Sequence, residues 1–391
     1  MFFRCRKKNL LNLWPLVKQD KTMLKLSKGI FIIFVLILFV SHTISASDKT
    51  VAGSIDSLVK EEFNTGKFII EHVMDAYDWH VVSFGETHIS IPLPIILYSK
   101  NPELHEGKSF HVFMSGKFHH AHDDYRGFRI SHSTENDGKI VELDLSGSEI
   151  GKPLDLSITK TIAEVLVSVI LILLVLFSVV RSAKRNQGKA PKGLHNLIEP
   201  VIIFIRDQVA KPAIGEKKYE KFMPFLLTLF FFILINNLMG LIPFPPFGAN
   251  VTGNIAITMV LALFTFFVTA IYGNKHYWKE IYNPDVPWWL KFPIPLMPIV
   301  ELSGVITKPF VLMVRLFANM LAGHMIVTVF ISLIFIFASL YGPVVGFLAS
   351  PVSIIFSVFI LLLDVLVSFI QAYVFTLLSA IYFGMATAEH H

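Results

Sequence analysis

Five acidic or basic side chains and two amides interrupt the two longest apolar stretches of this sequence, residues 295–337 and 344–388. They are Glu301, Lys308, Arg315, Asn319 and His324 in the first stretch, and Asp364 and Gln371 in the second. An ionisable group in the middle of a bilayer costs about 2.5–3.5 kcal/mol on insertion scales, so such groups mark ion pathways or other functional sites. A permanent cation near a titratable His and Asp could perform proton transfer and control it electrostatically.

The spacing of these residues places several of them on one side of a helix. Glu301, Lys308 and Arg315 are seven residues apart, so each step moves only about 20° around the helix. Asn319 joins that face. His324 follows Arg315 by nine residues, which turns it about 180° away and about 13 Å along the axis.

A turn at residues 341–343 would fold the two stretches into an antiparallel hairpin. In such a hairpin, the residue numbers of facing positions add to a constant. His324 with Asp364 and Arg315 with Gln371 give totals that differ by two, so both pairs fit one register to within half a turn. We therefore expect Arg315 to face the Gln371 amide and His324 to face the Asp364 carboxylate, as in a proton path that ends at an electrostatic gate.

The composition requires a membrane to hold these residues. Hydrophobic residues make up 53% of the 391 positions and charged residues 16%, against about 25% charge in soluble domains. The net charge of +5 comes from short basic clusters between apolar runs, which is typical of membrane topology and not of nucleic-acid binding. The single cysteine excludes a disulfide framework, a thiolate zinc site and an iron–sulfur cluster.

We predict an all-α polytopic membrane domain over residues 158–391, with about five transmembrane helices and one interfacial helix. Each of the last two spans exceeds 60 Å as a helix, against a hydrocarbon core of about 30 Å, so each must break in two or lie strongly tilted. No polar loop interrupts either one, which favours two long tilted helices. The expected spans are 161–180, 224–243, 251–272, 295–337 and 344–388, with the interfacial helix at 195–210.

The N-terminal part has the features of an exported segment. Basic residues precede a short apolar run at 30–40 and a small polar stretch, so we predict that residues 1–46 are a signal peptide, with an uncleaved anchor as the alternative. Met23 is a second possible start. Residues 47–157 are then a small extra-cytoplasmic α+β segment, with strands at 111–114 and 139–143 and a hairpin turn at 136–138. The basic cluster after the first span places that end of the span in the cytoplasm.

Several motifs together resemble subunit a of the rotary F-type ATP synthase, the ATPase subunit 6 family of the membrane F0 sector. They are KPF at 308–310, RLFANMLAGH at 315–324, QAYVF at 371–375, NNLMGLIP at 236–243, and IPLPIILY at 91–98 after Trp79-His80. The likeness is close over residues 160–391 and loose over 66–100. The motif centred on Arg315 is highly specific.

This resemblance implies a fold, partners and site residues. The last two helices would curve along a rotating ring of c subunits, and the chain would conduct protons through two half-channels separated by an essential arginine, Arg315. Glu301, Asn319 and Gln371 carry over as its polar neighbours. The partners would be the c-ring, the b subunits and, through them, the F1 catalytic head, in a bacterial inner membrane with a cytoplasmic C-terminus. Nucleotide chemistry would lie on other subunits, so this chain would be no enzyme by itself and would need no cofactor.

The sequence also departs from the family pattern. Many bacterial members carry Glu where this chain has His324, and His where it has Asp364, so acid and base have exchanged places across the hairpin. The pair keeps its proton chemistry, which favours protons over Na⁺ as the coupling ion. Gly240 stands where some relatives carry an acid, and it receives no role.

Other functions fit the residues less well. A secondary transporter would favour internal repeats with broken helices, and no repeat relates the two halves. A metal-binding protein built on the exported segment would use the HHAHDD tract at 119–124, but a second ligand group at fixed spacing is missing and a solvated loop is the simpler interpretation. The GSEIGKP sequence at 147–153 has the wrong spacing for a P-loop.

Overall fold

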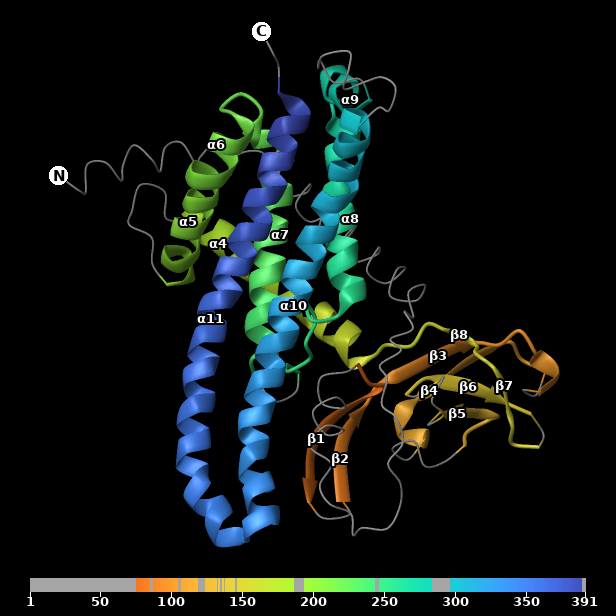
Figure 1. Ribbon diagram of the computed structural model, residues 1–391. Helices are drawn as coiled ribbons and strands as arrows, with labels where there is room; N and C mark the ends of the chain where they lie inside the picture. The colour runs from red at the N-terminus through yellow and green to blue at the C-terminus, as the bar shows by residue number, and fades with distance from the viewer. Residues whose placement is uncertain are drawn as a thin grey trace.

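The computed structural model describes residues 75–388, with gaps at 85–86, 105–106, 119–123, 132, 134–135, 137, 145, 186–192, 243–245 and 283–295. The predicted signal peptide, the following residues up to 74, and most of the HHAHDD tract lie outside the described residues. Within the described part, the chain forms a mostly helical unit with a small group of β-strands at one end (Figure 1).

Five helices are long and apolar enough to cross a membrane, as the sequence predicts. They are α4 (Lys160–Arg185), α7 (Tyr219–Gly240), α8 (Ile255–Tyr272), α10 (Leu296–Tyr341) and α11 (Pro343–Thr387). Their bounds lie within five residues of the predicted spans. The chain is therefore a polytopic membrane protein, because only a bilayer can accommodate five such apolar helices in one small unit.

The two longest helices form the predicted antiparallel hairpin (Figure 1). Helices α10 and α11 have 46 and 45 residues and neither is broken, so each is nearly 70 Å long at about 1.5 Å per residue. Only Gly342 separates them, with φ of 93°, a value that side chains with a Cβ rarely adopt. Pro343 then starts α11, where its missing N–H group leaves no hydrogen bond unmade.

Helix α7 forms the centre of the membrane core. Two thirds of the residues in its most apolar 18-residue stretch are buried, whereas the corresponding share is 11% in α10 and 17% in α11. Buried side chains from α4, α8, α10 and α11 pack around it, including Val165, Val260, Leu316 and Phe375. Most of the hairpin surface therefore has no neighbour within the described chain.

The predicted interfacial helix at 195–210 is present as two consecutive helical segments. They are α5 (Leu194–Phe204) and the π-helical turn η3 (Ile205–Ala210), and the short α6 (Lys211–Ile214) continues them. Asp207 accepts two hydrogen bonds of 2.9 Å from Arg206 and lies 3.0 Å from the Lys211 ammonium. The hydrogen bonds from Arg206, with the help of Lys211, lower the pKa of Asp207 to about 2.

The strands of the N-terminal part form one hairpin and two small sheets. The strands are β1 (Asp78–Phe84), β2 (Thr87–Pro92), β3 (Pro94–Tyr98), β4 (Phe110–Met114), β5 (Phe128–Ile130), β6 (Ile140–Leu143), β7 (Glu149–Gly151) and β8 (Leu154–Asp155). β1 pairs with β2, and the two three-stranded sheets have the antiparallel orders β4-β3-β8 and β5-β6-β7. They pack against each other over a core that includes Ile95, Leu97, Phe113 and Phe128.

The two strands predicted in this part are confirmed as β4 and β6. The turn predicted at 136–138 joins β5 to β6, and Gly138 has the positive φ of 71° that such turns need. The regular elements in the described residues between 75 and 159 are these strands and two short 3-10 helices, Pro102–Leu104 and Ser115–Phe118, so the predicted α+β mixture is not confirmed there.

The strands lie at the same end of the molecule as the turn between α10 and α11, whereas α9 (Lys275–Tyr282) and the C-terminal end of α11 lie at the opposite end (Figure 1). One contact that joins the strands to the membrane domain is a hydrogen bond of 3.2 Å from the Trp79 indole to the carbonyl of Phe247, in the loop between α7 and α8.

Candidate functional site

Arg315 lies on an exposed face of α10, which α11 reaches only at its edge, through Asn319. The exposed positions of this face follow helical spacing and are Val311, Val314, Arg315, Ala318, Asn319 and Ala322. The opposite face carries Leu312, Leu316 and Met320, which are buried against the core. Among the described residues, Arg315 makes no hydrogen bond or ion pair, so its guanidinium donors are uncommitted.

Asn319 and Gln371 join α10 to α11 beside Arg315. The Asn319 Nδ2 atom donates to Gln371 Oε1 at 3.0 Å. Gln371 is only 3% exposed, and its Nε2 atom has no hydrogen-bond partner in the described part of the chain. The register predicted from the sequence placed Gln371 opposite Arg315, but its hydrogen bond goes to Asn319, one turn further along α10. The reason is that Arg315 lies on the open face, whereas Gln371 points into the interface between the helices.

Asp364 lies against the backbone of α10 at Gly323. A Cβ atom at position 323 would be 2.9 Å from Asp364 Oδ1 and 3.0 Å from Oδ2. The carboxylate therefore fits only because residue 323 has no side chain. Helix α11 thus passes α10 at the height that the sequence register predicts, to within one residue.

His324 points elsewhere. Its Nε2 atom lies 3.2 Å from the position that a Cβ would occupy at Gly240 of α7. Successive residues of a helix differ by about 100° around the axis. Because the Asp364 carboxylate lies beside residue 323, residue 324 faces a different neighbour. No hydrogen bond joins His324 to Asp364 among the described residues, and His324 Nε2 and Asp364 Oδ2 are both buried without a partner. His324 and Asp364 thus lie at the expected height, but no hydrogen bond pairs them in this part of the chain.

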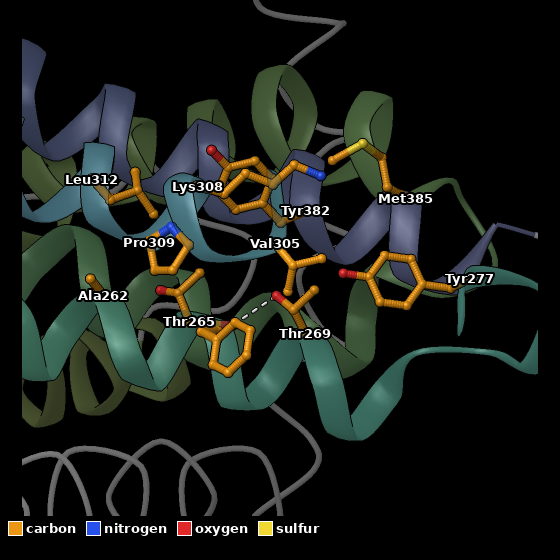
Figure 2. A pocket seen from close by; sticks show the side chains of 11 residues that line it. Ala262, Thr265, Thr269, Tyr277, Val305, Lys308, Pro309, Leu312, Tyr382 and Met385 are labelled. Carbon is orange, nitrogen blue, oxygen red and sulfur yellow. Dashed lines mark hydrogen bonds between the residues drawn. The ribbon is translucent and has the colours of Figure 1, made fainter. Parts of the chain in front are cut away.

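Lys308 and Glu301 lie toward the α9 end of α10, away from His324. The Lys308 ammonium stands 5.7 Å from the centre of the Tyr382 ring, within the range of a cation–π interaction. Figure 2 shows Lys308 and Tyr382 on the wall of a small pocket between α8, α10 and α11, which Tyr277 of α9 borders at one end. Glu301, two turns before Lys308, is half-buried. The seven sequence-selected residues therefore follow α10 and α11 from one end toward the middle.

The structure adds a buried polar group that the sequence argument did not select. Glu164 of α4 is fully buried, and its Oε2 atom accepts a hydrogen bond of 2.5 Å from the Ala249 amide. Nearby, Thr252 donates to Asn237 Oδ1, also at 2.5 Å. Glu164 is the one acid in an apolar run of about twenty residues, and that signal was available in the sequence.

Comparison with known proteins decides which family this chain belongs to. The family model for the ATP synthase A chain matches residues 165–384, which is more than half of the sequence. The chain belongs to the ATP synthase A chain family. A second model, a domain of unknown function named DUF8433, matches residues 68–157, which include the two small sheets.

Individual relatives agree with this assignment. ATP synthase subunit a of Chloroherpeton thalassium is 43% identical over 242 residues, 60% of this chain and 68% of the relative. ATP synthase subunit a 2 of Chlorobaculum tepidum is 45% identical over 241 residues, 60% of this chain and 64% of the relative. Subunit a of an Anaeromyxobacter species is 36% identical over 288 residues, 71% of this chain and 67% of the relative. The matched part therefore spans about two thirds of each relative.

These names settle two expectations. The resemblance to the subunit a family is confirmed. The relatives are named as one subunit of a synthase, so a chain of this family is a component of a larger enzyme and no catalyst by itself.

In the described part of the chain, no group of three or more His, Cys, Asp or Glu side chains could hold a metal ion; residues 119–123 lie outside that part.

Proposed function

We propose that this chain is the proton-conducting stator subunit of a rotary F-type ATP synthase, with Arg315 as the gate between two half-channels. The observation that carries the proposal is the position of Arg315, a cation with uncommitted donors in the open face of a hairpin made of two unusually long helices. That face would lie along a ring of c subunits, each bearing one carboxylate. The b subunits and the F1 head would complete the complex.

The proposed mechanism follows from charge. Arginine does not deprotonate in proteins, so a proton cannot hop through Arg315 from one half-channel to the other. A ring carboxylate beside it would be stabilised as the anion by about 4 kcal/mol at about 4 Å and an effective dielectric of about 20, equivalent to about three pKa units. The carboxylate would therefore release its proton into one half-channel, move past, and be reloaded from the other.

The remaining polar residues would form the two half-channels. His324 and Asp364 would serve the outer one. Because no hydrogen bond joins them, a proton would pass between them through water, which also would satisfy their unpartnered atoms. Lys308 and Glu301 would lie near the inner opening, and Asn319 with Gln371 would hold the two helices in register beside Arg315.

The proposed topology follows the sequence. The strands would lie outside the cytoplasm of a bacterial inner membrane, together with the turn between α10 and α11. The basic residues after α4 and the C-terminus would be cytoplasmic, in line with the positive-inside rule.

The test is the Arg315→Ala variant in the intact complex, with Arg181→Ala as the matched control, because Arg181 is also exposed but lies at the far end of α4. In inverted membrane vesicles, we expect Arg315→Ala to abolish ATP-driven acidification of the lumen while subunit levels on immunoblots stay normal. Arg315→Lys should also fail, since a desolvated lysine can lose its proton and lacks the planar fork. Coupled pumping at the wild-type rate in Arg315→Ala would refute the proposal.

A further inference from the structure

Glu164 is a buried carboxyl group in which one of the two oxygens has no hydrogen-bond partner in the described chain. It is 0% exposed, and only its Oε2 atom has a partner, the Ala249 amide. Its Oε1 atom has none among the described residues. Lys160, one turn earlier on α4, is close enough to interact with the Glu164 charge. A buried acid that serves only to bind one amide would be a costly structural device, because an amide side chain could accept the same bond.

The loop that binds Glu164 also borders His324. The carbonyl of Ala249 lies 3.3 Å, and His324 Nε2 lies 3.2 Å, from the position that a Cβ would occupy at Gly240. Asn237 Nδ2, about one turn before Gly240 on α7, is another buried atom without a partner in the described chain. Ala249 therefore connects two residues that each have an unpartnered polar atom, because its amide binds Glu164 and its carbonyl lies beside Gly240 and His324.

We propose that Glu164 is a proton-binding residue of this chain that passes protons to His324 past Ala249, which borders both residues. The inference rests on the proposed function. In the step, the O–H bond of the Glu164 carboxylic acid breaks and the proton reaches His324 Nε2 through water. Glu164 becomes a carboxylate, which Lys160 stabilises, and His324 becomes an imidazolium until it releases the proton toward Asp364. A new proton from the outer solution then restores the acid.

Two substitutions separate this role from a structural one. Glu164→Gln keeps the volume and an acceptor for the Ala249 amide but cannot carry a proton, whereas Glu164→Asp is smaller but keeps the acid. Ser168→Ala is the matched control, because Ser168 is also fully buried, lies one turn further along α4, and donates only to its own helix at Val165.

The measurement is passive proton flux through vesicles stripped of the F1 head, with subunit levels checked by immunoblot. We expect Glu164→Gln to slow the flux by about 10²-fold, the lower end of general acid–base contributions, and Glu164→Asp to retain a measurable part. Ser168→Ala should match wild type. Wild-type flux in Glu164→Gln would overturn the inference, as would an equal loss in both Glu164 variants with normal subunit levels. Arg315→Ala measured in the same vesicles distinguishes a failure of this step from a failure of the proposed function.

A separate observation concerns the outer face of the β4-β3-β8 sheet. The outward face of a small antiparallel sheet is normally polar. Here five outward side chains are apolar or aromatic and between 45% and 57% exposed, namely Tyr98, Phe110, Val112, Met114 and Leu154. They are contiguous, because Tyr98 pairs with both Phe110 and Leu154 across the sheet. Exposed Leu156 extends the face toward Lys160, where α4 begins.

Exposed lysines flank this apolar face. Lys100, Lys108 and Lys152 lie beside the strand ends near Tyr98, and Lys117 follows β4 at the other end. Apolar and aromatic side chains bordered by lysines are the combination that binds the boundary between headgroups and acyl chains in anionic membranes. The face also leads directly into a transmembrane helix. We infer that the outer face of the β4-β3-β8 sheet rests on anionic phospholipid at the surface of the membrane that the chain spans.

The test uses a spin label on Val112→Cys in the full chain with Cys5→Ser, reconstituted in vesicles containing anionic phospholipid, with Ser148→Cys in a turn as the exposed control. We expect the label at 112 to collide more often with oxygen than with a water-soluble nickel complex, the pattern of lipid contact, and the label at 148 to show the reverse. Lys108→Glu with Lys152→Glu should shift the label at 112 toward nickel. Frequent collision of the label at 112 with the nickel complex, in the chain that keeps Lys108 and Lys152, would overturn the inference. Protection from both reagents would also overturn it, in favour of a protein segment on that face.

Discussion

The hydrogen bond between Asn319 and Gln371 provides a quantitative test of how α10 and α11 are held together. It is 3.0 Å long, and Gln371 is 3% exposed, so Asn319→Ala leaves a buried oxygen unpaired. An unpaired buried group costs about 1–3 kcal/mol in soluble proteins, whereas side-chain pairs inside membranes average about 0.6 kcal/mol with a maximum of about 1.7. We therefore expect Asn319→Ala to lower the free energy of unfolding by about 1 kcal/mol.

The double variant decides whether the bond is responsible. Gln371→Leu with Asn319→Ala removes both polar groups, so the pair of changes should cost less than the two single changes added together. The assay is equilibrium unfolding of the full chain in mixed micelles by titration with SDS. Thr376→Val is the control partner for Asn319→Ala, because the Thr376 hydroxyl donates to its own helix, and these two changes should be additive. An additive result for Asn319 and Gln371 would refute the reasoning.

Three further predictions concern the contact between α10 and α11 and the ion pairs of η3. Gly323→Ala would place a Cβ 2.9 Å from an Asp364 oxygen, so it should slow passive proton flux in the wild-type chain but cause little further loss when it is added to Asp364→Ser, which shortens the side chain that it meets. Cysteines at Phe330 and Phe356, whose rings stack at 5.5 Å, should cross-link with a short thiol reagent on a gel, whereas cysteines at 330 and 364 should not. Asp207 has a depressed pKa of about 2, so its stabilising effect should be complete above about pH 4 and lost as the pH falls through about 2; the difference in Tm between wild type and Asp207→Asn should shrink over that range.

The features that depend on local chemistry could be predicted from the sequence. The five spans follow from unbroken apolar runs, because backbone groups in lipid must be satisfied within each helix. The hairpin follows from Gly342 and Pro343, which end one helix and begin the next. The height at which α11 passes α10 follows from that turn, because every residue adds the same rise on both helices, so Asp364 was expected within one residue of its place beside Gly323.

The sequence by itself thus determined which side chains enter the membrane and at what depth, whereas tertiary structure decided where they point. A helix rotates by about 100° per residue, so a small rotation about its axis, set by packing on α7 and α8, exchanges one neighbour for another without changing depth. Such a rotation lets Gln371 form its hydrogen bond with Asn319 instead of facing Arg315. It also directs His324 toward Gly240 instead of Asp364. Glu164 was visible as a lone acid in its span, but only Ala249, in the loop between α7 and α8, connects it to the surroundings of Gly240 and His324. That contact joins residues far apart in the chain, and no local pattern in the sequence encodes it.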